Sequence, residues 1–165
     1  MRFVKFLIIC FIIFFLILLG FSWFIPSEVR ISRAINLSVR QDSVLKNIND
    51  FARWKNWYEG FDKVTLTNEK VENGRIISCE VNGIALNQIV SNDSLVSVTM
   101  NKNKRPIENS FKLIRYSVGD SITLQNYMVF KFKWYPWEKL SSLFFDKSYG
   151  PIMEKNIQKL KEITP

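Results

Sequence analysis

The chain has 165 residues, a formal net charge of +8 at neutral pH and no histidine. The lack of histidine excludes Ser-His and Cys-His nucleophilic pairs and most zinc and iron sites. The two cysteines, Cys10 and Cys79, lie in an apolar run and in a strand-like segment, so they indicate neither an intramolecular disulfide nor a thiolate metal site. No glycine-rich phosphate loop is present either. We therefore predict no metal and no cofactor.

An uncharged apolar run extends from Phe6 to Ile25, with Arg2 and Lys5 before it and Pro26 after it. About 20 residues of helix span about 30 Å, the thickness of the hydrocarbon core of a bilayer. The residues at the end of the run are bulky where a signal peptidase requires small ones. We therefore predict a transmembrane helix that serves as an uncleaved signal-anchor, rather than a cleaved signal peptide.

This helix divides the chain into a membrane anchor, residues 1–26, and one domain, residues 27–165, which is long enough to bury a core. Positive charges flank the span on both sides, so the positive-inside count is a tie. A very short leading tail usually stays in the cytoplasm, and large following domains translocate largely regardless of charge. We expect a single-pass membrane protein with an extracytoplasmic domain. Its expected partner is the lipid bilayer, and the sequence identifies no protein partner.

The domain begins with a pattern of one strand and two short helices. Val29 to Leu37 alternates between apolar and polar residues, as a strand does. Asp42 or Ser43 is suited to cap a helix with apolar positions at Val44, Leu45, Ile48 and Phe51. Trp54 and Trp57, three residues apart, share one face of a second short helical piece.

The pattern then changes to period two, which predicts a meander of antiparallel strands. Val64 and Leu66 alternate with threonines, and Asn73-Gly74 and Asn82-Gly83 predict tight hairpin turns around strands 75–81 and 84–90. Two further strands are expected after the turn at Asn92-Asp93. The apolar residues of the first are Val96, Val98 and Met100, and those of the second are Phe111, Leu113 and Ile114. A turn at Val118-Gly119-Asp120 is expected to close the second strand.

The positive charges of the domain are scattered, apart from one cluster at Lys102 to Arg105. Pro106 follows this cluster, which we expect to lie in a solvated hairpin loop. We predict no nucleic-acid partner, because a tethered basic domain has anionic lipid as its nearest anionic surface.

The last strand has the clearest alternation. One face carries Ile122, Leu124, Asn126, Met128, Phe130, Phe132 and Trp134. Pro136 ends the strand, and apolar residues then recur at helical spacing, first at Trp137, Leu140, Leu143 and Phe144 and later from Met153 to Ile163, with an expected kink or break at Gly150-Pro151. This order predicts an α+β domain, in which a curved antiparallel sheet of about six or seven strands wraps around a long C-terminal helix.

Four stretches of the chain, residues 29–37, 49–57, 134–140 and 145–154, resemble the SRPBCC or START-like helix-grip superfamily of polyketide cyclase/dehydrase-related domains. The last stretch looks like a subgroup with one N-terminal membrane helix. The resemblance implies a largely apolar cavity between the long helix and the sheet, suited to lipids, sterols, polyketides or other hydrophobic molecules. The pocket of this superfamily has no invariant catalytic motif, so no catalytic residue is carried over. Its iron–sulfur oxygenase branch uses histidine ligands and is excluded.

Candidate ligand contacts are residues expected on the inward strand face or on the helices that close it: Asn126, Trp54, Trp57, Met128, Phe130, Arg115 and Phe144. The Asn126 amide needs a partner if it is buried, which is a neighbouring group, a water or a ligand. The two tryptophans line either a cavity mouth or the core. Arg115 is either a charge at the end of the pocket or the exposed end of its strand.

Three functions remain open. The first is a membrane-tethered binding module for a hydrophobic small molecule or lipid. The second is a cyclase- or dehydratase-like enzyme that works through ionisable groups such as Tyr58, Glu59, Glu80 and Tyr127, although their spacing singles out none of them. The third is an interaction or sensing domain whose aromatic core is filled.

Overall fold

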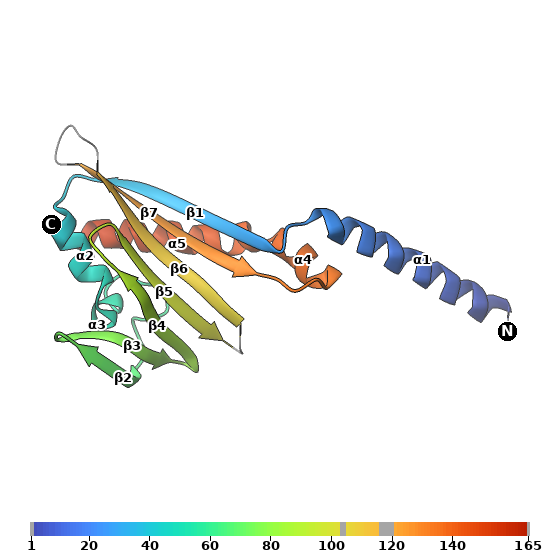
Figure 1. The fold of residues 1–165 in the computed structure, drawn as a ribbon, viewed down its shortest axis with the longest axis horizontal. Helices are drawn as coiled ribbons and strands as arrows, with labels where there is room; N and C mark the ends of the chain where they lie inside the picture. Colours follow the sequence, from blue (N-terminus) through green and yellow to red (C-terminus); the bar gives the residue numbers. More distant parts are fainter. Residues whose placement is uncertain (1, 103–104, 116–120, 165) are drawn as a thin grey trace.

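One antiparallel sheet and one long helix make up most of the domain in the computed structural model, which describes residues 2–102, 105–115 and 121–164. Over these residues the sheet has seven strands in the order β1-β7-β6-β5-β4-β3-β2 (Figure 1). The strands are β1 Glu28–Leu37, β2 Thr67–Glu72, β3 Arg75–Val81, β4 Ile84–Ser91, β5 Leu95–Lys102, β6 Arg105–Arg115 and β7 Ile122–Lys131. The helices are α1 Arg2–Phe24, α2 Gln41–Ile48, α3 Phe51–Trp54, α4 Pro136–Ser142 and α5 Phe145–Ile163.

The predicted fold class is confirmed. The sheet curves over α5, two short helices follow the first strand, and an apolar helix precedes it (Figure 1). Both predicted hairpins form, because Asn73 and Gly74, and again Asn82 and Gly83, adopt the positive φ angles that a tight two-residue turn requires. The predicted basic loop and the closing turn at 118–120 fall largely or wholly outside the described residues.

The boundaries of the short helices differ from prediction. Helix α2 begins at Gln41, with Arg40 at its N-cap, so neither Asp42 nor Ser43 caps it. The reason is that the Gln41 side chain is buried and donates to the backbone oxygen of Asp93, which fixes the start of the helix one residue earlier. Asp50 caps α3 instead, and its carboxylate accepts from the backbone N–H of Ala52 at 3.0 Å.

The tryptophan pair is therefore not on one helix, since α3 ends at Trp54 and Trp57 lies in the turn after it. Val64 and Leu66 precede β2 and do not belong to the ladder; they pack against the core from the connection. Strand β2 is exposed along its whole length, and its register with β3 shifts between Thr67 and Val71.

Strand β7 ends at Lys131, three residues before the predicted end. Phe132 lies beyond the end of β7. Its backbone N–H donates to the oxygen of Ser27, just before β1, at 2.8 Å. Trp134 points outward and is not part of the inner face. Of the expected kink or break at Gly150-Pro151, the break is wrong, because α5 continues through both residues and the interruption falls at Leu143 and Phe144, between α4 and α5.

The core is built from two apolar clusters between the sheet and the helices. The first cluster lies at the end that holds α2 and α3, and it includes Leu37, Trp54, Trp57, Phe111, Leu124 and Leu160. The second lies at the end next to α4 and contains Ile31, Met128, Phe130 and Met153. Helix α1 extends from this second end, away from the domain (Figure 1). It is long and apolar enough to cross a membrane, and none of its most apolar window is buried in the protein.

Candidate functional site

The inner face of the sheet carries a polar group between the two apolar clusters. Asn126 lies on β7 between Leu124 of the first cluster and Met128 of the second, and its side chain is buried. Its amide nitrogen donates to Asn109 Oδ1 on β6 at 2.6 Å and to the Ser110 carbonyl oxygen at 3.1 Å. The Asn126 amide is thus paired within the protein, which is the first of the alternatives that its sequence position left open.

The polar group continues from Asn109 to a tyrosine. Asn109 is fully buried, and its Nδ2 donates to the hydroxyl of Tyr58 at 3.1 Å. Burial raises the pKa of Tyr58, and the nearby Tyr149 adds to this rise, so the phenol stays neutral at physiological pH. The hydroxyl in turn points to the sulfur of Met100 at 4.0 Å. We call Asn126, Asn109 and Tyr58 the polar chain.

Aromatic rings fill the end of the interior that holds α2 and α3. Trp54 stacks on Tyr58 at 4.6 Å between ring centroids and meets the edge of Phe51 at 4.9 Å. Trp57 packs against Phe111 at 5.6 Å. Both indole N–H groups donate to backbone oxygens, Trp54 to Ile48 at 2.9 Å and Trp57 to Asn47 at 3.3 Å. Each tryptophan is enclosed by its neighbours, so neither forms a lip at the surface.

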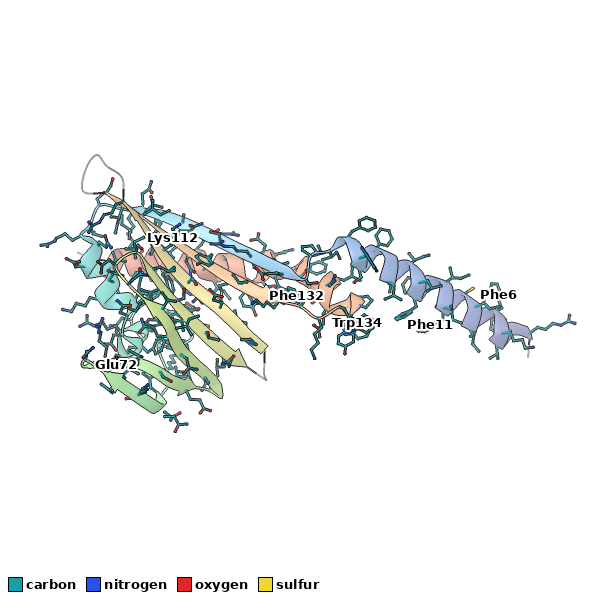
Figure 2. All side chains as sticks on the ribbon, viewed as in Figure 1. Phe6, Phe11, Glu72, Lys112, Phe132 and Trp134 are labelled. Carbon is teal, nitrogen blue, oxygen red and sulfur yellow. The ribbon has the colours of Figure 1, made fainter. Side chains whose placement is uncertain are left out.

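The opposite end of the interior, next to α4 and α1, is apolar but less enclosed. Met128 and Phe130 are buried there, and the side chains around them are only half-buried. We call these surrounding residues the apolar collar: Val29, Met100, Ile107, Phe132, Phe145 and Tyr149. Figure 2 places Phe132 at this end and Lys112 at the far end of the sheet. The interior thus has a large buried cluster at the end that holds α2 and α3 and a small one, surrounded by the collar, at the end next to α4.

An arginine joins α5 to β1 beside the interior. Arg33 Nε lies 2.6 Å from Glu154 Oε1, and Arg33 Nη1 lies 3.0 Å from Asp146 Oδ1. These hydrogen bonds, first to Asp146 and then to Glu154, raise the pKa of Arg33. The guanidinium crosses α5 over Gly150, where a Cβ atom would lie 3.0 Å from Arg33 Cζ. The lack of a side chain at Gly150 is therefore what lets Arg33 reach both carboxylates.

Two of the predicted ligand contacts lie away from the interior. Arg115 is exposed at the end of β6, in a surface hollow of about 370 Å³ that it shares with Gln41, Asp42, Asp93, Ser94 and Leu113. Phe144 is exposed between α4 and α5. The structure therefore buries the other five in the interior, with Trp54 and Trp57 at one end, Met128 and Phe130 at the other and Asn126 between them. Ligand contact by any of the seven remains a prediction.

Sequence reasoning missed several residues of the interior. Asn109 and Ile107 share the inward face of β6 with Phe111, and extending the alternation backwards from Phe111 would have found both. Tyr149 lies on α5 one residue before Gly150-Pro151, where a break was expected, so its inward face could not be recognised.

The ionisable residues considered for catalysis do not gather. Glu59 is bound to Lys155 and Lys159 at the surface, and Glu80 bonds Asn68 at the β2 edge. Tyr127 lies under Arg30 on the outer face of β7. Among the described residues, no group of three or more His, Cys, Asp or Glu side chains is arranged to hold a metal.

Neither a protein-family model nor a curated protein matches this sequence. Solved structures match it over most of its length. A START superfamily protein from Mycobacterium smegmatis has 13% identity and a TM-score of 0.61, with 82% of this chain and 96% of that chain covered. The chain has a START-like helix-grip fold.

Two further solved structures match this chain over most of its length. A hypothetical protein from Helicobacter pylori has 9% identity and a TM-score of 0.59, with 83% of this chain and 88% of that chain covered. The di-domain ARO/CYC StfQ, from the steffimycin biosynthetic pathway, has 6% identity and a TM-score of 0.59, with 83% of this chain and 50% of that chain covered. Identities this low establish the START-like fold and leave the function to be argued from the site.

Proposed function

We propose that this chain is a membrane-anchored binding module for a hydrophobic small molecule or a lipid. The molecule enters between α5 and the sheet at the apolar collar, with its apolar part against Met128 and Phe130. The observation that carries this proposal is the asymmetry of the interior: among the described residues, only four apolar side chains are buried at the collar end, whereas the opposite end holds a much larger buried cluster that includes Trp54, Trp57 and Phe111. The START-like fold is consistent with this use of the interior.

The anchor supports the same conclusion. Helix α1 is uncharged from Phe6 onward and extends from the end of the domain that carries the collar (Figure 1). A molecule that leaves the bilayer beside α1 reaches the collar without crossing the aqueous phase. The domain lies on the extracytoplasmic side in this proposal, for the reasons of tail length and domain size given above.

The polar chain restricts the polarity and charge of the part of a ligand that reaches it. Asn126, Asn109 and Tyr58 bond to one another, and the Tyr58 phenol is held neutral. A ligand that reaches them meets amide and hydroxyl groups. We therefore expect the deep part of the ligand to be apolar or neutral, with any charged headgroup left at the collar.

Photocrosslinking tests this proposal. The full chain, in maltoside detergent, is irradiated with a fatty acid that carries a diazirine near the end of its acyl chain, and modified peptides are identified by mass spectrometry. Adducts are expected on β6, β7 and α5 at the collar, in addition to α1. Ile107→Arg places a charge in the collar and should abolish the collar adducts. Ile89→Arg, at an exposed position of β4, should leave them unchanged.

Adducts confined to α1 in the unmodified chain would contradict the proposal and would favour an interaction domain with a filled interior. Near-ultraviolet circular dichroism of both variants, dominated by the buried tryptophans, shows whether each retains the native core.

A further inference from the structure

Helix α4 buries two polar side chains and exposes an aromatic one. Glu138 and Ser142 are buried, with 9% and 4% of their surface exposed, whereas Trp137 on the opposite side of the helix is 60% exposed. The buried groups are paired: Glu138 Oε2 accepts from the backbone N–H of Lys133 at 3.0 Å, and Ser142 Oγ donates to the Lys139 carbonyl oxygen at 2.6 Å. A helix at a water-facing surface has the opposite arrangement.

The exposed apolar groups continue on both sides of α4. Trp134, Leu143 and Phe144 are 68%, 64% and 68% exposed. Within the described part of residues 27–164, every exposed Trp or Phe side chain belongs to this one segment. Trp134 and Trp137 are linked through the ring of Tyr135, which packs against both. Exposed apolar groups gathered in one segment, unlike those scattered singly, are typical of a surface that another apolar phase covers. We call Trp134, Trp137, Leu143 and Phe144 the aromatic platform.

Trp134 of the platform and Lys139 of α4 lie against the end of α1. Lys139 Nζ donates to the backbone oxygens of Ser22 at 3.2 Å and Ile25 at 3.0 Å, and so closes the C-terminus of α1. A groove of about 590 Å³ runs between the two elements, lined by Leu19, Gly20, Ser22, Trp23, Trp134 and Lys139. Figure 2 shows Trp134 beside the point where α1 leaves the domain. The most exposed aromatic groups of α1, Trp23 and Phe24, lie at this same end.

The charges near the platform fit the polar headgroups of a membrane. Residues 131–147 contain four lysines and two carboxylates. Both carboxylates are engaged within the protein, Glu138 with the Lys133 backbone and Asp146 with Arg33. The exposed lysines of this segment, Lys131, Lys133 and Lys147, border the apolar groups. Tryptophan flanked by lysine is the composition found at the level of lipid headgroups.

We infer that the aromatic platform is a second membrane contact, which lies in the interfacial layer of the bilayer on the side where α1 ends. Its partner is the lipid surface itself. The inference rests on the proposed anchoring by α1, and it adds that the domain is held against the bilayer with one defined face. Continuity with the end of α1 is what distinguishes this surface from a docking site for another protein.

Site-directed labelling tests the inference. The full chain with Cys10→Ser and Cys79→Ala receives one new cysteine, and each variant is labelled with the fluorophore NBD and reconstituted into vesicles of phosphatidylcholine and phosphatidylglycerol. The three positions are Leu143→Cys in the platform, Glu72→Cys at the exposed far end of the domain (Figure 2), and Leu16→Cys in α1. Quenching is measured with aqueous iodide and with lipids that carry a nitroxide at the headgroup or along the acyl chain.

We expect a several-fold smaller iodide quenching constant at position 143 than at position 72, with strong quenching at 143 by the headgroup or shallow acyl nitroxide. Trp134→Ser with Trp137→Ser, both at exposed positions, should move the label at 143 back toward the aqueous values. Equal iodide access at 143 and 72 would overturn the inference. Protection from iodide without quenching by lipid nitroxides would also overturn it, and would indicate a protein partner or a second copy.

The label at position 16 separates this inference from the proposal on which it rests. Deep lipid quenching at 16 together with an aqueous label at 143 contradicts only the platform. An aqueous label at 16 contradicts the anchoring, and the platform with it.

Discussion

Amides on the inner face of the sheet occupy positions where a leucine or a phenylalanine would be expected. Asn126 and Asn109 are buried with 1% or less of their surface exposed, between clusters that are otherwise apolar. Burial of such groups costs free energy unless every donor and acceptor is matched. Their mutual hydrogen bond, extended to Tyr58, meets that requirement and couples β7, β6 and the turn after α3.

This coupling predicts non-additive stability. Asn126→Leu leaves Asn109 Oδ1 and the Ser110 carbonyl oxygen without this donor, and should lower the free energy of unfolding by about 1–3 kcal/mol. Asn109→Leu should have a similar effect, but the double variant should lose less than the sum, because both members of the pair are then gone. Chemical denaturation of the four proteins in detergent measures this cycle. Additive losses would mean that the two amides do not support one another.

The polarity of this site was visible in the sequence only in part. Asn126 stood out because it interrupts a long alternating strand. Asn109 did not, because the strand pattern was recognised only from Phe111 onward, and Tyr58 was considered only as an ionisable group. Alternation shows which residues share a face, but not which residue of the neighbouring strand lies opposite, since that depends on the register of β6 with β7.

Among the elements, α5 is held against β1 by Arg33, whose guanidinium occupies the space that a side chain at position 150 would fill. Arg33 lies across the helix at Gly150 and bonds Asp146 and Glu154, one helical turn to either side. A glycine within a helix normally costs about 0.5–1 kcal/mol relative to alanine. Here it leaves room for an ion-pair group that is only one-quarter exposed on the arginine side.

This geometry predicts a reversal of the usual glycine effect. With Arg33→Met, Gly150→Ala should stabilise the protein by about 0.5–1 kcal/mol through helix propensity alone. In the unmodified chain the same substitution displaces the guanidinium, so this gain should vanish or change sign. Thermal unfolding of the four proteins gives the comparison. The same gain in both backgrounds would show that Arg33 does not depend on Gly150.

Sequence periodicity predicted most elements, but it misjudged the region from Trp134 to Pro151. Gly-Pro normally interrupts a helix, and only the approach of Arg33 from a distant strand explains the glycine. Trp137, Leu143 and Phe144 recur at helical spacing, and Phe144 is among the predicted ligand contacts, yet all three are exposed. A repeat of apolar residues shows that they share a side of a helix, but it does not tell whether that side meets the protein interior or another apolar phase.

At the scale of the whole molecule, the fold was predictable because turns, alternation and element order all agree on a sheet around one helix. The difference between the two ends of the interior was not predictable in the same way. The buried rings around Trp54 and Trp57 lie at the end of the interior far from α1, whereas the collar and the platform lie at the end next to α1. The two surfaces proposed to meet a ligand and a lipid surface therefore lie at the end of the domain from which α1 extends.

The proposed sidedness gives a test on intact cells. With an epitope tag after Pro165, the tag of the full chain should be removed by protease added to spheroplasts, because the domain lies outside the cytoplasmic membrane. A tagged cytoplasmic protein should remain intact in the same sample. Full protection of the tag, lost only on lysis, would place the domain in the cytoplasm instead.

The junction between α1 and the domain has a mechanical consequence. Only residues 25–27 separate α1 from β1. Lys139 donates to the backbone oxygens of Ser22 and Ile25, and the backbone N–H of Phe132, just after β7, donates to the oxygen of Ser27. A rotation of α1 relative to the domain would therefore break bonds to α4 and to the start of β1 at once. If α1 spans a bilayer as proposed, the orientation of the domain above the membrane follows the tilt of this one helix.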